Sequence, residues 1–145
     1  MGVIDFSIIP KGSRVTIDSA PIIYLLEDHP QFLKEYLPLF ERVETGEIQA
    51  ILSVVTLAEV LAGPLRHGNE IMADRYFRTL STSCNWQVQS MDSELAFMAA
   101  RIKTRYGLKL PDAVQVATAI QSGSVALVTH DRDFSSVNEI QILIG

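Results

Sequence analysis

Residues 111–129 are the part of the sequence that most restricts the fold. Pro111 can begin a helix, and the residues after it are apolar on almost every side, so this helix must be buried. Gly123 ends the helix, and Val125–Thr129 then forms a continuous apolar strand pattern, typical of a strand covered on both faces. A buried helix that leads into such a strand predicts an α/β protein with a parallel sheet.

Strand and helix patterns alternate along the rest of the chain. This order predicts parallel strands joined by right-handed helical crossovers. Proline affects two of the helices: Pro38 is expected to kink or split one, and Gly63-Pro64 to end another. Strands are expected at residues 14–18, 48–53, 86–88, 125–129 and 140–144, and helices at 19–26, 31–44, 54–65, 68–82, 93–106 and 111–122.

The length of 145 residues fits one domain, and the sequence shows no internal repeat or linker. We therefore expect an N-terminal leader at residues 1–13 and a single domain at 14–145. No apolar run reaches the roughly 20 residues that a membrane span needs, so no membrane partner is expected. The N-terminus has no long apolar stretch, and Cys84 is the single cysteine. Both features favour a reducing cytoplasm.

The net charge of −5 argues weakly against a nucleic-acid partner, because proteins that bind phosphates usually carry a basic surface. Carboxylates that hold divalent cations also make a chain acidic, and the bound ions reverse the local charge. An acidic composition therefore permits a phosphodiester substrate when metal is present, without favouring one.

Four acids fall where a parallel sheet of this kind would bring them together. Asp18 and Asp131 follow predicted strands, at the sheet edge where α/β proteins bind ligands. Asp112 lies in the first turn of the buried helix. Glu59 interrupts an otherwise apolar helix, where its neighbours are mostly small and leave room for a ligand.

Each acid taken singly has an ordinary structural explanation. An Asp after a strand can form a turn or cap the next helix, and an acid in a first helical turn is favoured by the helix dipole. Converging carboxylates, however, repel one another and raise one another's pKa, so a cluster of them implies a compensating cation. Hard oxygen ligands of this type suit Mg²⁺ or Mn²⁺.

The order and spacing of four segments resemble the PIN domain family, and in particular the VapC-like toxins of bacterial and archaeal toxin–antitoxin systems. Together the segments span almost the whole chain after the leader. The resemblance implies a three-layer α/β/α sandwich with a central, mostly parallel sheet, which cleaves RNA with Mg²⁺ or Mn²⁺. The matching segments are residues 15–19, 53–60, 110–119 and 127–134.

The resemblance also implies roles for individual residues. Asp18, Glu59 and Asp112 match the three central metal-binding acids, and Asp131 matches the fourth, although Asp133 is an alternative. Thr129 matches a hydroxyl residue that hydrogen-bonds a site carboxylate and orients it. The resemblance extends to two residues beside these acids. Ser19 stands where Ser or Thr is common in the family. His130 stands where Asn is more usual, and this difference is expected to have little effect.

The implied chemistry is hydrolysis of RNA by water, which one or two metal ions would activate. The implied partners are an RNA substrate, a small antitoxin protein and a second copy of the chain. Apolar residues on the helices at 31–44 and 68–82 are candidates for the two protein surfaces, although they are first of all core residues. Some residues are candidates for phosphate or base contacts, although each taken singly is better explained as surface charge or as packing at the core edge. They are Lys103, Arg105, Lys109, Arg132, Tyr24 and Tyr106.

Two other functions stay open. The first is a PIN domain without catalysis that acts as a binding module. The second is a Mg²⁺-dependent phosphoryl-transfer domain of the receiver or phosphatase type, which also places an Asp at a strand end. The phosphatase would require a second Asp two residues after Asp18, where Ala20 stands.

Overall fold

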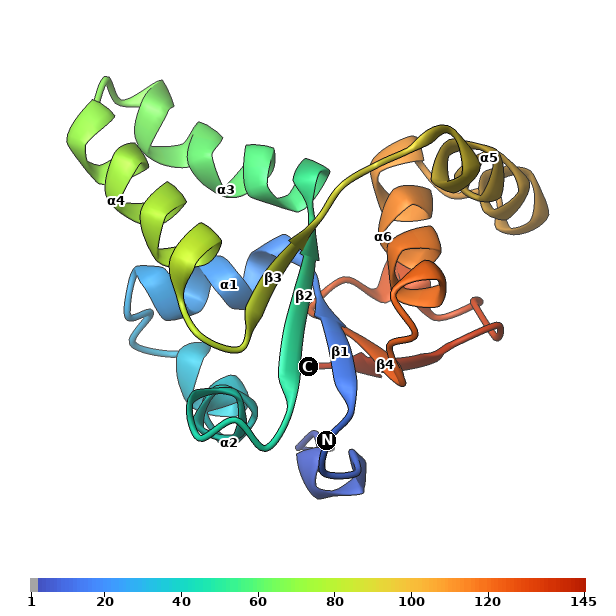
Figure 1. The fold of residues 1–145 in the computed structure, drawn as a ribbon, viewed down its shortest axis with the longest axis horizontal. Helices are drawn as coiled ribbons and strands as arrows, with labels where there is room; N and C mark the ends of the chain where they lie inside the picture. Colours follow the sequence, from blue (N-terminus) through green and yellow to red (C-terminus); the bar gives the residue numbers. More distant parts are fainter. Residues whose placement is uncertain (1–2) are drawn as a thin grey trace.

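Five parallel strands form the centre of the computed structural model, which describes residues 3–145 (Figure 1). The strand order is β3-β2-β1-β4-β5, so the chain builds the sheet outward on one side of β1 and then returns to pair β4 on its other side. The predicted parallel sheet is confirmed, and every strand pair is parallel. The strands are β1 (Arg14–Ile17), β2 (Gln49–Ser53), β3 (Trp86–Gln89), β4 (Ala126–Thr129) and β5 (Gln141–Ile144).

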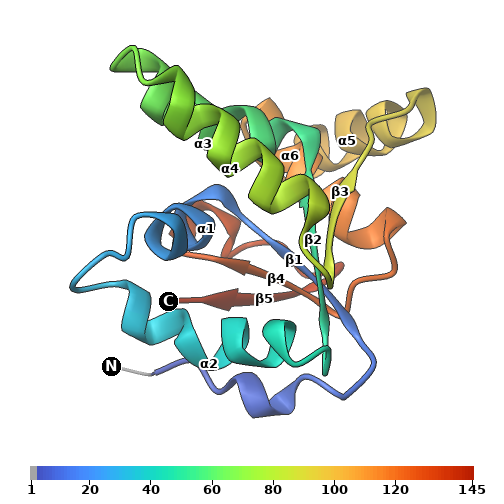
Figure 2. The same cartoon turned by 60° about the vertical axis from the view of Figure 1, so that its left-hand side comes forward.

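Helices cover both faces of the sheet, which confirms the three-layer α/β/α architecture. Helices α1 to α4 lie on one side, and α5 and α6 lie on the other (Figures 1 and 2). Within residues 3–145, no helix combines the length and the apolar character that a membrane crossing requires. The helices are α1 (Ser19–Leu26), α2 (Leu33–Glu44), α3 (Val54–Arg66), α4 (Glu70–Thr82), α5 (Ser93–Tyr106) and α6 (Leu110–Gln121).

The alternating side chains of the central strands enter two separate cores. Val15 and Val128 pack in the core shared with α1 and α2, whereas Leu127 packs in the core shared with α5 and α6. Every residue from Ala113 to Ala119 is buried, as the all-round apolar pattern of this helix predicts. The buried α6 contacts β1, β2 and β4, so its N-terminal turn is held firmly at one edge of the sheet.

Two helices, α2 and α3, contain an internal proline and are continuous in the structure. Of the kink or split expected at Pro38, the split does not occur, because α2 runs unbroken from Leu33 to Glu44. Pro38 is exposed, so water can solvate the carbonyl that loses its helical partner, while Tyr36 and Leu39 are fully buried and anchor both halves. Helix α3 ends at Arg66, close to the end expected near Gly63-Pro64.

The segment before β1 contributes to the core. Asp5 caps a short 3-10 helix, Phe6–Ile8, by accepting a hydrogen bond from the Ser7 amide at 3.0 Å. Phe6 and Ile9 are buried in the same core as α2. The Arg42 guanidinium donates to the Phe6 carbonyl at 2.7 Å, which fixes this segment against α2.

Candidate metal centre

The central strands β1 and β4 end side by side, and Asp18 follows the first of them. Its amide donates to the Val128 carbonyl at 2.9 Å, which continues the strand pairing by one residue. Its carboxylate caps α1, because Oδ1 accepts a hydrogen bond from the Ser19 amide at 2.8 Å. Asp18 is buried, so its second carboxylate oxygen also requires a partner inside the protein.

Thr129, the last residue of β4, provides that partner. Its hydroxyl donates to Oδ2 of Asp18 at 2.8 Å and accepts from the Asp131 amide at 3.0 Å. Because a hydroxyl has a single proton, these two contacts use it as donor to the acid and as acceptor from the backbone. Thr129 thus fixes both the orientation of the Asp18 carboxylate and the start of the loop that carries Asp131.

Three further acids meet beside this pair. Carboxylate oxygens of Asp112, Asp131 and Asp133 all lie within 4.8 Å of one another. Asp112 stands in the first turn of α6, and Asp131 caps a 3-10 turn, Arg132–Phe134, by accepting from the Asp133 amide at 2.9 Å. Phe134 is fully buried and anchors this turn. The structure therefore places both candidates for the fourth acid at the same location.

Glu59 approaches the group from α3. It is exposed, as expected for an acid at the rim of a site rather than in a core. The pKa of its carboxyl is nevertheless raised, first by partial burial and then by the negative charges of Asp18 and Asp112. A hydrogen bond with Ser19 acts in the opposite direction. Glu59 is thus electrostatically coupled to the acids of the sheet edge.

The remaining acids show the same excess of negative charge. The pKa of Asp112 is raised to about 6, first by burial and then by Asp18, Asp131 and Asp133, and Lys109 offsets only part of this. Burial raises the pKa of Asp18 as well, against the hydrogen bonds that stabilise its charged form. The ion pairs among residues 3–145 include none of the acids of this cluster. A bound cation would supply the missing charge.

The raised pKa of Asp112 predicts a pH dependence of metal binding. Below about pH 6 this carboxyl carries a proton that a cation must displace, so the apparent affinity for Mn²⁺ should fall as the pH decreases from about 7 to about 5. Binding near pH 5 should release close to one proton, and binding near pH 7.5 close to none. Calorimetry in buffers of different ionisation enthalpy measures both quantities. An affinity that is constant over this range would contradict the prediction.

A buried polar network that the sequence interpretation left without a role connects α3 to α6. Ser53 caps α3 by accepting from the Thr56 amide at 3.0 Å, and its hydroxyl lies 3.4 Å from Oε1 of Gln115. The Gln115 amide also donates to the Thr56 hydroxyl. The network holds the helix of Glu59 against the helix of Asp112. Gln115, one of two polar residues in the otherwise apolar 113–119 segment, was the available signal.

Several residues proposed for substrate contacts have partners within the protein. Arg105 pairs with Glu139 at 2.6 Å, and Tyr106 donates to Asn138 at 2.8 Å. Lys103 donates to the Leu108 carbonyl at 3.1 Å. These contacts support the structural explanation for the three side chains. Of the remaining candidates, Lys109 lowers the pKa of Asp112 through its positive charge, and Arg132 is exposed. Tyr24 packs against other aromatic rings.

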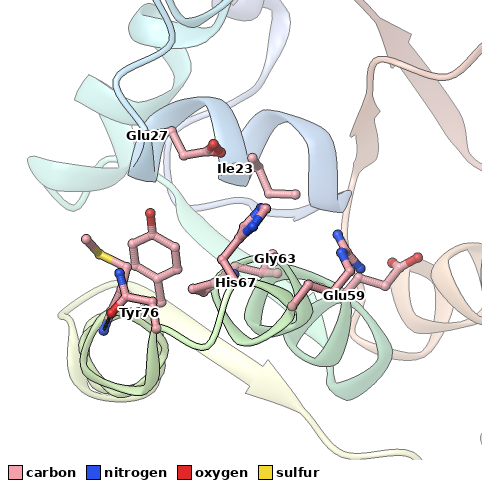
Figure 3. Close-up of a pocket in the computed structure, with 11 residues that line it drawn as sticks. Ile23, Glu27, Glu59, Gly63, His67 and Tyr76 are labelled. Carbon is pink, nitrogen blue, oxygen red and sulfur yellow. Dashed lines mark hydrogen bonds between the residues drawn. The ribbon is translucent and has the colours of Figure 1, made fainter.

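A groove of about 400 Å³ begins at Glu59 and runs between α1, α3 and α4 (Figure 3). Ile23 of α1 and Glu27, which follows α1, form one wall, and α3 and α4 form the other. The groove therefore extends from the rim of the acid cluster across the helical face of the molecule. The opposite wall includes Gly63 of α3, Tyr76 of α4 and His67 between the two helices.

Comparison with known proteins identifies the family. The sequence matches the PIN domain over residues 15–140. The chain belongs to the PIN domain family. All four resembling segments fall within the matched range. The sequence match and the structural likeness therefore both support the predicted fold class.

Solved structures with this PIN fold include components of toxin–antitoxin complexes. A VapBC2 complex from Rickettsia felis, bound to a promoter DNA fragment, matches with a TM-score of 0.70 and 14% identity over 89% of this chain and 96% of that one. VapC20 from Mycobacterium tuberculosis, described as a toxin that cleaves the sarcin–ricin loop, matches with a TM-score of 0.67 and 16% identity over 89% and 98%. At these identities the likeness shows the fold.

A toxin–antitoxin complex from Klebsiella pneumoniae matches with a TM-score of 0.67 and 24% identity, over 87% of this chain and 94% of that one. In sequence, an uncharacterized protein of Archaeoglobus fulgidus is 60% identical over 42 residues. That match covers 29% of this chain and 66% of the other protein, slightly less than two thirds of its length.

Proposed function

We propose that this PIN domain is a metal-dependent endoribonuclease that hydrolyses RNA phosphodiester bonds. One observation carries the proposal: the carboxylates of Asp112, Asp131 and Asp133 meet at one sheet edge, and the acids that follow β1 and lie on α3 are electrostatically coupled to them. None of these acids has an ion-pair partner among residues 3–145. Separate structural roles would not require acids from four elements to meet. A shared cation accounts for the convergence.

The donor set fits Mg²⁺ or Mn²⁺, because every candidate ligand is a carboxylate oxygen. We assign Asp18, Glu59, Asp112 and Asp131 as the metal-binding acids. A bound ion would lower the pKa of the attacking water and neutralise charge on the phosphoryl group. The residues of the chain contribute by holding their carboxylates in place, and no side chain is required as a nucleophile.

Within this site, Thr129 orients the Asp18 carboxylate through its 2.8 Å hydrogen bond. Asp131 is assigned as the fourth ligand because its loop is attached to the same hydroxyl through its amide. The Asp133 amide is already a donor to Asp131, so Asp133 supports the loop while its own carboxylate stays within 4.8 Å of the other two. Both acids thus contribute to the charge that attracts the cation.

RNA is the proposed substrate because the PIN fold and four acids occur here together, and a VapC toxin with this fold is described as cleaving the sarcin–ricin loop. The complete set of acids favours an active enzyme over a binding module. The phosphoryl-transfer alternative receives no support from the family match.

The purified protein is expected to cleave RNA in the presence of Mn²⁺ or Mg²⁺ and to lose all activity with EDTA, because the acids alone provide no nucleophile. Incubation with total RNA, followed by sequencing of the cleavage ends, measures both the activity and its target. Added Mn²⁺ should restore cleavage after EDTA is removed. Metal binding without cleavage of RNA would favour the binding module, and cleavage that persists in EDTA would refute the proposed mechanism.

We further propose that the domain is the toxin of a toxin–antitoxin pair in the cytoplasm and that it forms a homodimer. Helix α4 exposes Ile71 at 77% and Phe77 at 47%, and α2 exposes Leu37 at 38%, so α4 is the stronger candidate for a protein contact. The dimer is expected to dissociate to monomers in Ile71→Asp/Phe77→Asp, while Leu37→Asp leaves it intact. Light scattering of the three proteins tests this, and a monomeric wild type would contradict the dimer.

A further inference from the structure

We propose that Tyr36 and His130 are positioning residues that hold the loop after β4 so that Asp131 faces the other acids. The inference rests on the proposed metal site. Nδ1 of His130 lies 2.7 Å from the Tyr36 hydroxyl, and the same hydroxyl donates to the Thr129 carbonyl at 3.3 Å. One phenol therefore holds two consecutive residues of the loop that carries the fourth acid.

Tyr36 is a rigid anchor for this loop. It lies on α2 and is completely buried, and its ring packs against those of Phe6 and Tyr24. Its position is consequently fixed by the core and not by the loop it contacts. A hydroxyl held in this way can define the position of the backbone that hydrogen-bonds to it.

The histidine ring is held by hydrogen bonding and by packing. Nδ1 of His130 and the Tyr36 hydroxyl share a short hydrogen bond, whose direction depends on the tautomer of the ring. The ring is held from two further sides, by Tyr24 at 5.5 Å and Phe32 at 5.0 Å between centroids. His130 is thus turned towards α1 and α2 while its neighbour Asp131 joins the acid cluster.

Thr129 is consequently held from both sides. Its hydroxyl bonds Asp18 and the Asp131 amide, and its carbonyl bonds Tyr36 and the Gly145 amide. Loss of the Tyr36 contacts would leave the strand pairing intact but release the loop at residues 129–131. Ligand geometry tolerates displacements of only about 0.5 Å, so a small shift of the loop would weaken metal binding.

We expect histidine at position 130 to contribute to the site, contrary to the expectation that its replacement of the more usual asparagine has little effect. The histidine side chain makes a specific hydrogen bond here, and it does so with a buried residue 94 positions earlier in the chain. Asparagine at this position could preserve the contact, because its side-chain δ atoms match the position of Nδ1 in histidine. Alanine could not.

The test compares Mn²⁺ affinity with metal-free thermal stability. Tyr36→Phe keeps the ring and removes the hydrogen bonds, and it is expected to weaken Mn²⁺ binding by about 10-fold or more. His130→Ala should show a similar loss, and His130→Asn should restore most of the affinity. Phe40→Leu is the matched control: it alters a buried aromatic residue of the same helix that stacks on Trp86, and should lower the melting temperature without changing the affinity.

The outcomes separate this inference from the proposed function. If wild-type protein binds no Mn²⁺, the proposed metal site itself is refuted. If the wild type binds Mn²⁺ and Tyr36→Phe binds it equally well, with only a change in melting temperature, the residues serve the core and the inference is refuted. An affinity of His130→Asn as low as that of His130→Ala would refute the role of the hydrogen bond.

Discussion

Asp112→Asn is expected to abolish RNA cleavage and to leave the protein folded. The substitution keeps the volume of the side chain but removes one anionic ligand from the centre of the acid cluster. Loss of a residue that only supports a metal ligand typically costs 10- to 100-fold in affinity or activity, so loss of a ligand should cost more than about 100-fold. Single-turnover cleavage of RNA in Mn²⁺ measures the loss. Wild-type activity in the purified variant would refute the assignment of the site.

The same variant should be more stable than the wild type when metal is absent. The folded protein raises the pKa of Asp112 to about 6, so stability contributed by the protonated acid is present at low pH and is lost as the pH rises through that value. Asparagine carries no charge at any pH, so the variant does not lose stability in this way as the pH rises. Allowing for solvent screening at a half-buried position, we expect a gain of roughly 1 kcal/mol at pH 7 in the free energy of unfolding. Thermal denaturation in EDTA provides the measurement.

Glu94→Gln is the matched control for Asp112→Asn. Glu94 also lies in the first turn of a helix, α5, whose capping residue Asp92 contacts Gln121 at the opposite end of α6 from Asp112. Neutralising Glu94 should change neither cleavage nor Mn²⁺ binding.

The fourth acid can be tested by Mn²⁺ titration. Asp131→Asn is expected to lose more affinity for Mn²⁺ than Asp133→Asn, and the reverse order would reassign the fourth acid.

Thr129→Val should weaken Mn²⁺ binding by about 10- to 100-fold and also lower stability. Valine has nearly the same shape but leaves Oδ2 of the buried Asp18 and the amide of Asp131 without the hydroxyl that both contact. An unsatisfied buried group of this kind costs about 1–3 kcal/mol. Calorimetric titration with Mn²⁺ and thermal denaturation measure the two effects separately.

Thr129→Ser retains a hydroxyl and should restore most of the metal affinity. Thr118→Val is the matched control, because Thr118 is an equally buried threonine whose hydroxyl donates to the Val114 carbonyl within α6. It should alter stability without altering the affinity for Mn²⁺. A Thr129→Val protein that binds Mn²⁺ like the wild type would show that the hydroxyl does not orient the Asp18 carboxylate.

Most of the fold could be predicted from the sequence because most of its strands are short apolar runs that alternate with helical patterns. The buried segment Ala113–Ala119 and the strand Ala126–Thr129 occur where their patterns place them. The error at Pro38 arose because a local rule predicts the loss of one hydrogen bond. It does not include the core contacts of Tyr36 and Leu39, which keep the helix continuous.

The candidate site was predicted less completely. Acids that follow strands in a parallel sheet meet at one edge, so Asp18 and Asp131 could be located from topology alone. The contact between Tyr36 and His130 joins residues 94 positions apart, and that between Thr56 and Gln115 joins residues 59 apart. A local pattern can mark Gln115 as unusual in an apolar segment, but it identifies the partner in neither contact. Such contacts arise from the packing of whole helices and become visible only in three dimensions.

The hydrogen bond from Thr129 to Asp18 connects residues 111 positions apart, which has a consequence during translation. A ribosome would release β1 long before it has synthesised β4, and domains of this kind fold as units. Until the last strands emerge, Asp18 lacks both its hydroxyl partner and its acidic neighbours. Under the proposed function, a nascent chain would therefore carry no assembled nuclease site until β4 and the loop that carries Asp131 have left the ribosome.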